Sequence, residues 1–501
     1  MENGGIISVD IGTTSMRAVL LDRTGRILTA AQEMNPPDYF PGGRVEQDPR
    51  SWENLLPRVL RKCREEAESA GIGVEGISLA SQRSSIIPLG KDRRPIAPAI
   101  MWQDTRAEPL CHALEPQQKK VYQKSGLKIS TVFSAVKMKW LKEQRRAVYD
   151  AAWKITGIHD YVLCLLTGNL VTDRCIASRT SLLNLFTLDW DDELIGIFGL
   201  ERGKLCDLID QGSTAGTLTN EMARLSGLPA GLPVVSAGGD QQNAALGLGL
   251  LGPGDVIIST GTGSYVLGVS EKPVFDPGER VLCNVSAVPG GYILEAGALT
   301  MGTVYRWFTD TFYSPETGFS DVDNEARESP PGSGGVIVLP HFSGSGAPHW
   351  NPGAKGIFYN LGLNTRRGDL ARAILEGIAT EMADNADLIA GLSGLPETFR
   401  AAGGLSKSAV FSQIQADACG RPVVCSREHE ATSLGAWISA AKNLGLFTDY
   451  PAAYESAARN HTAAVFHPVH EHTELYRKIR RKKQAIYNAL TEHNVYDTDY
   501  E

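Results

Sequence analysis

The sequence lacks the signatures of several common nucleotide-binding proteins. No Gly-x-x-x-x-Gly-Lys-Ser/Thr string occurs in its 501 residues, so a P-loop is excluded as the means of holding a nucleotide. A Gly-x-Gly-x-x-Gly string runs from Gly247 to Gly252, but it follows an expected helix and leads into a Gly-Pro-Gly turn. The dinucleotide fingerprint needs a strand before it and a helix after it. We therefore interpret Gly247 to Gly252 as the end of a helix.

Other absences limit the compartment and the partners. The eight cysteines form no Cys-x-x-Cys pair and no zinc-ligand spacing, which predicts reduced, mostly buried thiols and a cytoplasmic protein. No apolar run approaches 18 residues and no basic segment precedes the first strand, so we expect neither a membrane span nor a secretion signal. A net charge of -8 disfavours nucleic-acid binding. We expect a small-molecule partner, and a homo-oligomer stays possible.

The composition describes a globular protein with more than one core. Hydrophobic residues make up 42% of the chain and charged residues 21%. A chain of 501 residues is too long for one ordinary core, so two domains of roughly 200 to 250 residues are expected. Near the C-terminus, residues 473–490 predict a helix with five basic side chains on a solvated face, namely Lys478, Arg480, Arg481, Lys482 and Lys483.

One carboxylate stands at a strand-to-helix junction. The strand-like run 232–235 is followed by Gly238, Gly239 and Asp240, and then by a segment that can begin a helix. Open α/β sheets place ligands at the carboxyl ends of their strands. Asp240 could cap the helix, or it could act as a general base on a hydroxyl. The stretch alone leaves both interpretations open.

Two hairpins of one design lie half a chain apart. Residues 6–22 predict two strands joined by a Gly/Thr/Ser turn at 11–15, and residues 255–269 repeat the pattern with the turn at 261–264. Backbone N–H groups and hydroxyls in such turns can converge on an anion, although Gly and Thr are also common in ordinary turns. The repetition predicts a duplicated fold whose two turns face one cleft and hold a polyphosphate between them.

Polar side chains on neighbouring loops suggest a sugar pocket. Gln82, Arg83 and Ser84 follow an expected strand, and Trp102 precedes Asp104 on the next loop. Hydroxyls need fixed donors and acceptors while an aromatic face covers C–H groups, so this set suits a sugar or polyol. A surface Arg–Asp pair beside a half-buried Trp is the alternative. Residues 399–418 predict a strand, a Gly-Gly turn and a helix, which could approach a flat ligand or be ordinary turn chemistry.

From about Ile6 to Leu446, the chain resembles the FGGY carbohydrate kinases, members of the sugar kinase, heat-shock chaperone and actin superfamily. The resemblance implies an α/β fold of two ribonuclease H-like domains with a cleft between them. It divides the chain into a sugar-binding domain (1–247), a nucleotide-binding domain (248–465) and a helical tail (466–501). The motifs that carry it are Asp10–Ser15, Gln82-Arg83, Trp102–Asp104, Phe133–Leu141, Asp160-Tyr161, Ala177–Arg179, Gly239–Gln242, Gly261–Gly263, Glu376–Ala379 and Gly403–Ser406.

The resemblance also implies roles for individual residues. Asp240 would be the general base, favouring chemistry over capping, and would share Mg2+ with Asp10. The substrate would contact Gln82, Arg83, Ser84, Trp102, Asp240 and Gln241. ATP would contact Gly12, Thr13, Thr14, Arg17, Thr262, Gly263, Gly404 and Ser408. Phosphoryl transfer needs mainly alignment and charge neutralisation, which these residue types can supply.

Two departures bear on the substrate. Gln82-Arg83 and Asp240–Gln242 look most like glycerol kinases, but Ser84 stands where those enzymes have a Glu, and Val132 where they have a Tyr. Losing an acid and a phenol opens volume, so a polyol or ketose of about four to six carbons is expected, with glycerol as the alternative. A non-catalytic sugar sensor or a chaperone-like ATPase of the same superfamily is the alternative of another class.

Overall fold

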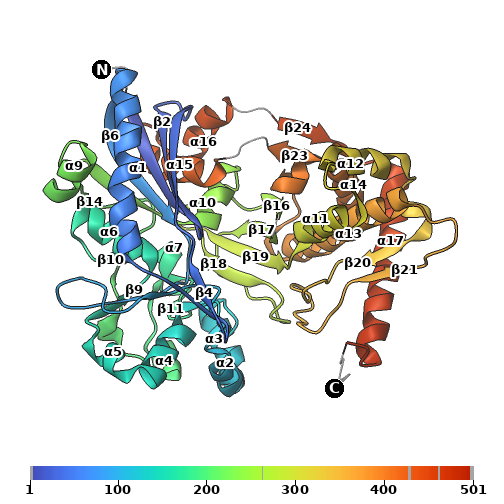
Figure 1. Ribbon diagram of the computed structural model, residues 1–501, viewed down its shortest axis with the longest axis horizontal. Helices are drawn as coiled ribbons and strands as arrows, with labels where there is room; N and C mark the ends of the chain where they lie inside the picture. The colour runs from blue at the N-terminus through green and yellow to red at the C-terminus, as the bar shows by residue number, and fades with distance from the viewer. Residues whose placement is uncertain (1–3, 262, 427–429, 461–462, 497–501) are drawn as a thin grey trace.

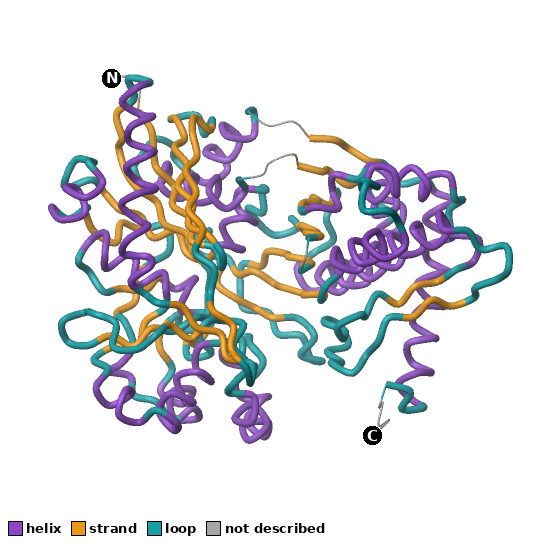
Figure 2. Tube along the Cα trace, in the orientation of Figure 1, coloured by secondary structure: helices purple, strands orange, loops and turns teal. Residues whose placement is uncertain are grey.

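The computed structural model describes residues 4–261, 263–426, 430–460 and 463–496. The chain forms two lobes, each built on a mixed β-sheet with helices on its faces (Figure 1, Figure 2). The first half of the chain builds one lobe, and the second half builds most of the other. Within the described ranges, no helix is both long and apolar enough to span a lipid bilayer.

The N-terminal sheet begins with the first predicted hairpin. Strands β1 and β2 pair antiparallel, with Asp10 opposite Arg17, and β6 and β15 extend the sheet in parallel on the other side of β1. The order across the sheet is β14-β15-β6-β1-β2-β3. The bounds are β1 Gly4–Ile11, β2 Ser15–Asp22, β3 Ile27–Met34, β6 Gly73–Ser81, β14 Ser213–Thr217 and β15 Pro233–Gly239.

The C-terminal sheet repeats this topology. Strands β16 and β17 form the second predicted hairpin, β22 and β23 follow in parallel, and the order is β18-β19-β17-β16-β22-β23-β24. The predicted α/β fold of two ribonuclease H-like halves is confirmed. The bounds are β16 Val256–Thr260, β17 Ser264–Ser270, β18 Leu282–Val285, β19 Tyr292–Ala298, β22 Phe399–Ala402, β23 Val423–Ser426 and β24 Ala463–Phe466.

Helices cover both sheets, and short strands form small two- and three-stranded sheets outside the two main ones (Figure 1). The longer helices are α1 Arg50–Ser69, α4 Ser134–Gln144, α6 Ile158–Thr167, α10 Asp240–Gly247, α11 Met301–Phe312, α12 Phe319–Glu328, α13 Arg367–Ser393, α14 Ala409–Cys419, α15 Ala431–Asn443, α16 Tyr450–Ala458 and α17 His470–Glu492. The shorter helices are α2 Glu108–Leu114, α3 Gln118–Ser125, α5 Arg146–Ala151, α7 Arg174–Ala177, α8 Asp192–Phe198 and α9 Asn220–Ser226. The short strands are β4 Asp38–Phe40, β5 Arg44–Gln47, β7 Ile87–Leu89, β8 Ala99–Ile100, β9 Lys154–Thr156, β10 Val171–Asp173, β11 Leu183–Asn184, β12 Asp189–Trp190, β13 Asp207–Ile209, β20 Ile337–Leu339 and β21 Ile357–Tyr359.

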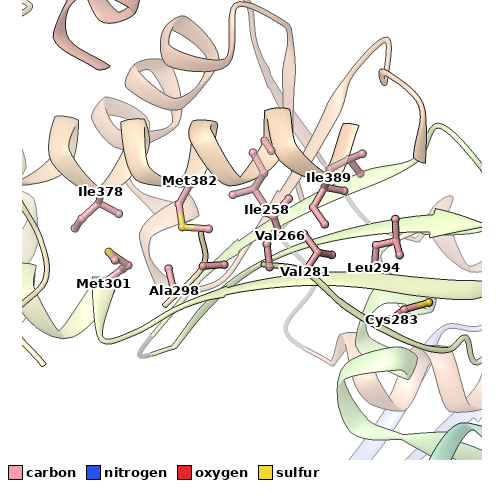
Figure 3. Packing of buried hydrophobic residues seen from close by; sticks show 14 of the residues in the cluster. Ile258, Val266, Val281, Cys283, Leu294, Ala298, Met301, Ile378, Met382 and Ile389 are labelled. Atoms are coloured by element: carbon pink, nitrogen blue, oxygen red, sulfur yellow. The ribbon is translucent and has the colours of Figure 1, made fainter. Parts of the chain in front are cut away.

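Helix α13 forms the centre of the C-terminal core. Met382 and Ile389 point from this helix toward Ile258 of β16 and Val266 of β17, and all four side chains are fully buried (Figure 3). The apolar face of α13 is therefore the face that packs on the sheet. Gly377 permits a close approach to β20, because a Cβ there would lie 2.8 Å from the carbonyl oxygen of Val338.

One helix from each half of the chain packs on the sheet of the other half. Helix α10 follows β15, yet its Ala245 joins a buried cluster with residues of β16 and β17. Helix α15 follows β23, yet its Trp437 is buried against the N-terminal sheet with Val19. The two helices cross so closely that a Cβ on Gly435 would lie 1.9 Å from the carbonyl oxygen of Asn243. The predicted boundary at residue 247 thus divides the sequence, whereas α10 and α15 connect the lobes in space.

The C-terminal helix does not expose all of its basic residues. Lys483 on α17 is 3% exposed, and its Nζ lies 2.8 Å from Glu381 and 3.0 Å from Asp384, both on α13. Arg480 also pairs with Asp384. The prediction of a wholly solvated basic face was wrong, because helical periodicity alone cannot show that α13 offers two acids to this surface of α17.

Candidate active site

A cavity of about 760 Å³ is lined by both halves of the chain. The N-terminal half contributes the loops after β1, β6 and β15, and the C-terminal half contributes β17, β19 and the segment that contains Trp350. Eight of the predicted site residues line it together: Thr13, Gln82, Arg83, Ser84, Trp102, Asp240, Gln241 and Gly263. The fold thus gathers loops that lie up to half a chain apart.

Asp240 lies in this cavity and is the first residue of α10. The helix is capped by Gly239 and not by the Asp240 side chain, whose Oδ1 instead accepts a hydrogen bond from the N–H of Gln241 at 2.8 Å. The carboxylate is 29% exposed and lies 3.2 Å from Nε of Arg83. Burial raises its pKa, and the guanidinium of Arg83 opposes that shift. The Asp240 carboxylate thus binds one N–H of the first turn of α10 and also faces the cavity.

Arg83 belongs to a buried charge network that spans the two lobes. Its Nη1 donates to Oε1 of Gln242 at 3.1 Å and lies 3.9 Å from Glu295 on β19. Arg179 approaches the same carboxylate of Glu295 at 3.3 Å. Burial, followed by repulsion from Arg83, lowers the pKa of Arg179 to about 10. Two guanidiniums therefore share one acid at the back of the cavity.

The two loops predicted to bind a sugar, which contain Gln82 and Trp102, are hydrogen-bonded to the turn of the first hairpin. The indole Nε1 of Trp102 donates to Oγ1 of Thr13 at 3.0 Å, and Nε2 of Gln82 donates to the carbonyl oxygen of Gly12 at 3.0 Å. The backbone N–H of Gln82 also donates to the carbonyl oxygen of Ile11 at 2.7 Å. These bonds fix the Gly/Thr turn relative to the polar loops, so a phosphate at the turn and a hydroxyl at the loops would be held in register.

Ser84 and Val132 both line the cavity. Ser84 has a φ of 71°, and its hydroxyl donates to the carbonyl oxygen of Arg179 at 3.2 Å. That hydroxyl is thus already committed to the backbone. Neither position supplies an acid or a phenol, in line with the expectation of a wider pocket.

Other predicted residues of the first hairpin, Asp10, Thr14 and Arg17, are not among those that line the cavity. Asp10 is half-buried with its Oδ1 lacking a hydrogen bond, while Thr14 is exposed. Burial raises the pKa of Asp10 to about 8, with further contributions from the charges of Asp240 and Glu430. Arg17 forms an ion pair with Glu430, and its Nη1 donates to Gln32 at 3.1 Å.

The donor chemistry fits a divalent cation held jointly by protein and phosphate. Among the described residues, no group of three or more His, Cys, Asp or Glu side chains could enclose a metal ion. Mg²⁺ bound with a nucleotide needs only one or two carboxylates, because phosphate oxygens and water supply the other ligands. The orphaned oxygen of Asp10 and its repulsion by Asp240 are what two carboxylates show when they face a site for a cation.

Two predicted nucleotide contacts in the C-terminal half, Gly404 and Ser408, are not among the residues that line the cavity. Ser408 caps α14 by accepting a hydrogen bond from the N–H of Phe411 at 3.2 Å, and Gly404 opens onto free space. Gly403 has a φ of 94°, and a Cβ there would lie 2.5 Å from the carbonyl oxygen of Thr260. This turn therefore adjoins the second hairpin. Thr262 lies outside the described residues.

The sequence did not single out several residues of the cavity wall. Glu295 is the only charged residue of an otherwise apolar strand, a pattern that could have marked it as a functional residue. Tyr265 directly follows the second hairpin turn. Arg179 belongs to the family motif Ala177–Arg179, but the resemblance assigned it no function. No local sequence pattern marked Lys128 or Trp350 as a site residue. In the structure, Nζ of Lys128 lies 4.9 Å from the ring centroid of Trp350. All five line the cavity.

Comparison with known proteins decides the family. Residues 5–247 match the FGGY family of carbohydrate kinases, N-terminal domain, and residues 256–444 match the C-terminal domain of the same family. The chain belongs to the FGGY family of carbohydrate kinases. Its enzyme class is therefore that of a phosphotransferase with an alcohol group as acceptor.

Relatives and solved structures agree with this family over nearly the whole chain. The glycerol kinase of Thermus brockianus is 34% identical over 475 residues, covering 91% of this chain and 93% of that protein. Gluconate kinase from Lactobacillus acidophilus superposes with a TM-score of 0.90 at 27% identity, covering 97% and 98% of the two chains. Plasmodium falciparum glycerol kinase with ADP gives a TM-score of 0.89 at 25% identity, covering 98% of each chain. The FGGY fold is thus common to relatives with different named substrates.

Proposed function

We propose that this FGGY kinase transfers the γ-phosphate of ATP to a hydroxyl of a polyol or ketose larger than glycerol. The observation that carries the proposal is Asp240, a partly buried carboxylate in a cavity that is also lined by one residue of each Gly/Thr hairpin turn, Thr13 and Gly263. A kinase of this class needs one base, an aligned acceptor and charge neutralisation. The cavity offers all three.

Asp240 is the proposed general base. Its carboxylate accepts the proton of the attacking hydroxyl, while Arg83 holds it at 3.2 Å and keeps it directed into the cavity. Burial raises the pKa of Asp240, which makes the carboxylate a stronger proton acceptor than an exposed one. Gln82, Trp102 and Gln241 supply donors and an aromatic surface for the remaining hydroxyls and C–H groups.

The phosphates are proposed to lie between the hairpin turns. The turns at 11–15 and 261–264 present backbone and hydroxyl donors from opposite lobes, so a polyphosphate would be gripped from both sides. Asp10 and Asp240 would hold Mg²⁺, which neutralises phosphate charge when bound. Gly404 and Ser408 would border the adenosine, beside the second hairpin. Closure of the two lobes would exclude water, which competes as a phosphate acceptor.

The width of the pocket favours a substrate longer than glycerol. Ser84 and Val132 leave the wall between Arg83 and Phe133 without the acid and phenol that glycerol kinases are expected to have there. The cavity volume of about 760 Å³ is in the range of sites for larger organic ligands. Glycerol is the second candidate, because the similar curated proteins named above include a glycerol kinase. The intact Asp240 disfavours a non-catalytic sensor.

The test is ADP release from Mg-ATP in the presence of glycerol and a panel of four- to six-carbon polyols and ketoses. We expect one longer compound to stimulate release at least tenfold over the rate without an acceptor, and to stimulate it more than glycerol does. Preference for glycerol would identify a glycerol kinase. Release that no compound of this panel stimulates would contradict a kinase of neutral polyols or ketoses. A thermal-shift screen of the same compounds with an ATP analogue gives an independent reading of binding.

A further inference from the structure

The cavity carries more positive than negative side chains. Arg83, Arg179 and Lys128 line it, whereas Asp240 and Glu295 are its only acids among the described residues. Both acids are engaged, because Asp240 pairs with Arg83 and Glu295 is shared by Arg83 and Arg179. Lys128 is therefore the cation for which the cavity provides no counter-charge.

Lys128 has a defined position but no ion-pair partner. It is half-buried, and its ammonium lies over the indole ring of Trp350 at 4.9 Å from the centroid. The nearby acids serve other groups, because Asp276 is paired with Arg280 at 2.7 Å and Glu279 accepts from Gln118 at 2.9 Å. Within the described part of the chain, no acid lies within ion-pair distance of Lys128.

The surroundings of Lys128 differ from those of the reacting centre. Lys128 stands on the loop between α3 and α4 and lies over the ring of Trp350, whereas Asp240 begins α10 and pairs with Arg83. Both residues line the cavity, and these two contacts share no residue. Lys128 and Trp350 therefore form a part of the cavity wall distinct from the Asp240–Arg83 pair.

The described residues leave one buried donor of Arg179 without a hydrogen-bond partner. Its side chain lines the cavity and is 6% exposed, yet its Nε makes no hydrogen bond within the described structure. The ring of Phe133 covers the guanidinium at 4.9 Å. A buried donor without a partner carries a free-energy cost that a ligand oxygen would remove. Arg179 thus brings this unpaired donor to the cavity wall.

We propose that the substrate is a polyhydroxy carboxylate, with its hydroxyl at Asp240 and its carboxylate at the cationic wall formed by Lys128. The proposal rests on the function proposed above and names the substrate class for that same cavity. The half-buried ammonium over Trp350 binds the carboxylate as a charge-assisted pair. The apolar faces of Trp350 and Val132 cover the C–H groups between the two ends. A neutral polyol would leave Lys128 without a counter-charge in a partly desolvated site.

The experiment compares sugar acids with neutral polyols of equal chain length. Ribonate, xylonate and gluconate are assayed by ADP release against ribitol, xylitol and sorbitol, and each is also tested by thermal shift without nucleotide. We expect kcat/KM for at least one acid to exceed that for its matched polyol tenfold or more. Lys128→Met should lower this acid-to-polyol ratio at least tenfold, whereas Lys128→Arg should keep most of it.

The matched control is Lys482→Met. Lys482 also lies over an aromatic ring, that of Tyr359 at 5.1 Å, but on α17 and outside the cavity lining. The ratio of kcat/KM for the acid to kcat/KM for the polyol should be the same in Lys482→Met as in the wild type. A polyol preference in the wild type, or an unchanged ratio in Lys128→Met, would overturn the carboxylate proposal while leaving a kinase of neutral polyols. Absence of stimulated release with either set would overturn the proposed function together with it.

Discussion

Replacing Asp240 by Asn separates catalysis from folding. The change keeps the shape of the side chain but removes its ability to take a proton, so kcat should fall by about 10²- to 10⁴-fold, the usual range for loss of a general base. Arg83 keeps its hydrogen bond to Gln242 at 3.1 Å and its approach to Glu295 at 3.9 Å, so it is not stranded. Binding of ATP should change little.

The effect on stability has the opposite sign from the effect on activity. Burial raises the pKa of Asp240 above its ordinary value, so the charged form is less favourable in the folded protein than in the unfolded chain. The stability associated with this carboxyl is present below the ordinary pKa and is lost as the pH rises through the folded value. At neutral pH, the neutral Asn should leave the free energy of unfolding unchanged or higher, a common relation at active sites.

Two measurements check this prediction. Steady-state ADP release across pH 5 to 9 should show wild-type kcat rising as Asp240 loses its proton, and Asp240→Asn should lack that rise. Thermal unfolding should show no loss of stability. Asp310→Asn, an exposed position on α11, is the matched control and should behave like the wild type in both assays. Turnover of Asp240→Asn within tenfold of the wild type, or an unchanged acidic limb, would refute the assignment of Asp240 as the base.

Three further predictions concern the scaffold. Lys483→Met removes the ammonium that pairs with the buried carboxylate of Glu381, and it should lower the free energy of unfolding by about 3–5 kcal/mol in denaturant titration, while exposed Lys482→Met should change it by less than about 0.5 kcal/mol. Gly435→Ala should cost about 1–3 kcal/mol by forcing α10 and α15 apart, while Gly391→Ala on α13, where a Cβ meets nothing within 4 Å, should be neutral or stabilising. Trp102→Phe should lower kcat/KM about two- to tenfold through the lost indole hydrogen bond, and an unaltered value would show that this bond does not position the substrate.

Local patterns in the sequence predict much of the cavity because it is built from strand ends. The hairpins around residues 11–15 and 261–264 follow from alternating apolar residues and Gly-rich turns, and the structure confirms both. Asp240 also follows a readable strand. Capping and catalysis make the same demand on sequence, so the family resemblance was needed to favour catalysis. In the structure, the carboxylate accepts one hydrogen bond from the first turn of α10 and also lines the cavity.

Long-range pairing is what the sequence could not show. Glu295 meets Arg83 and Arg179 only because β19 of one lobe faces loops of the other, at separations of more than 100 residues. Lys483 is buried for the same reason, since α17 packs on α13 from the far end of the chain. Burial of a charge depends on which distant acid the fold brings to it, and periodicity contains no information about that.

The proposed base lies next to the crossing of α10 and α15 and is attached to both lobes. Asp240 directly follows the last residue of β15 in the N-terminal sheet, and it begins α10, whose Ala245 packs on the C-terminal sheet. The base is therefore anchored to both halves near the crossing of α10 and α15, where Gly435 lies against Asn243. A rotation of the lobes about this crossing would move the second hairpin and Trp350 through a larger arc than Asp240. Closure would then bring the phosphate to the hydroxyl while the base keeps its place beside Arg83.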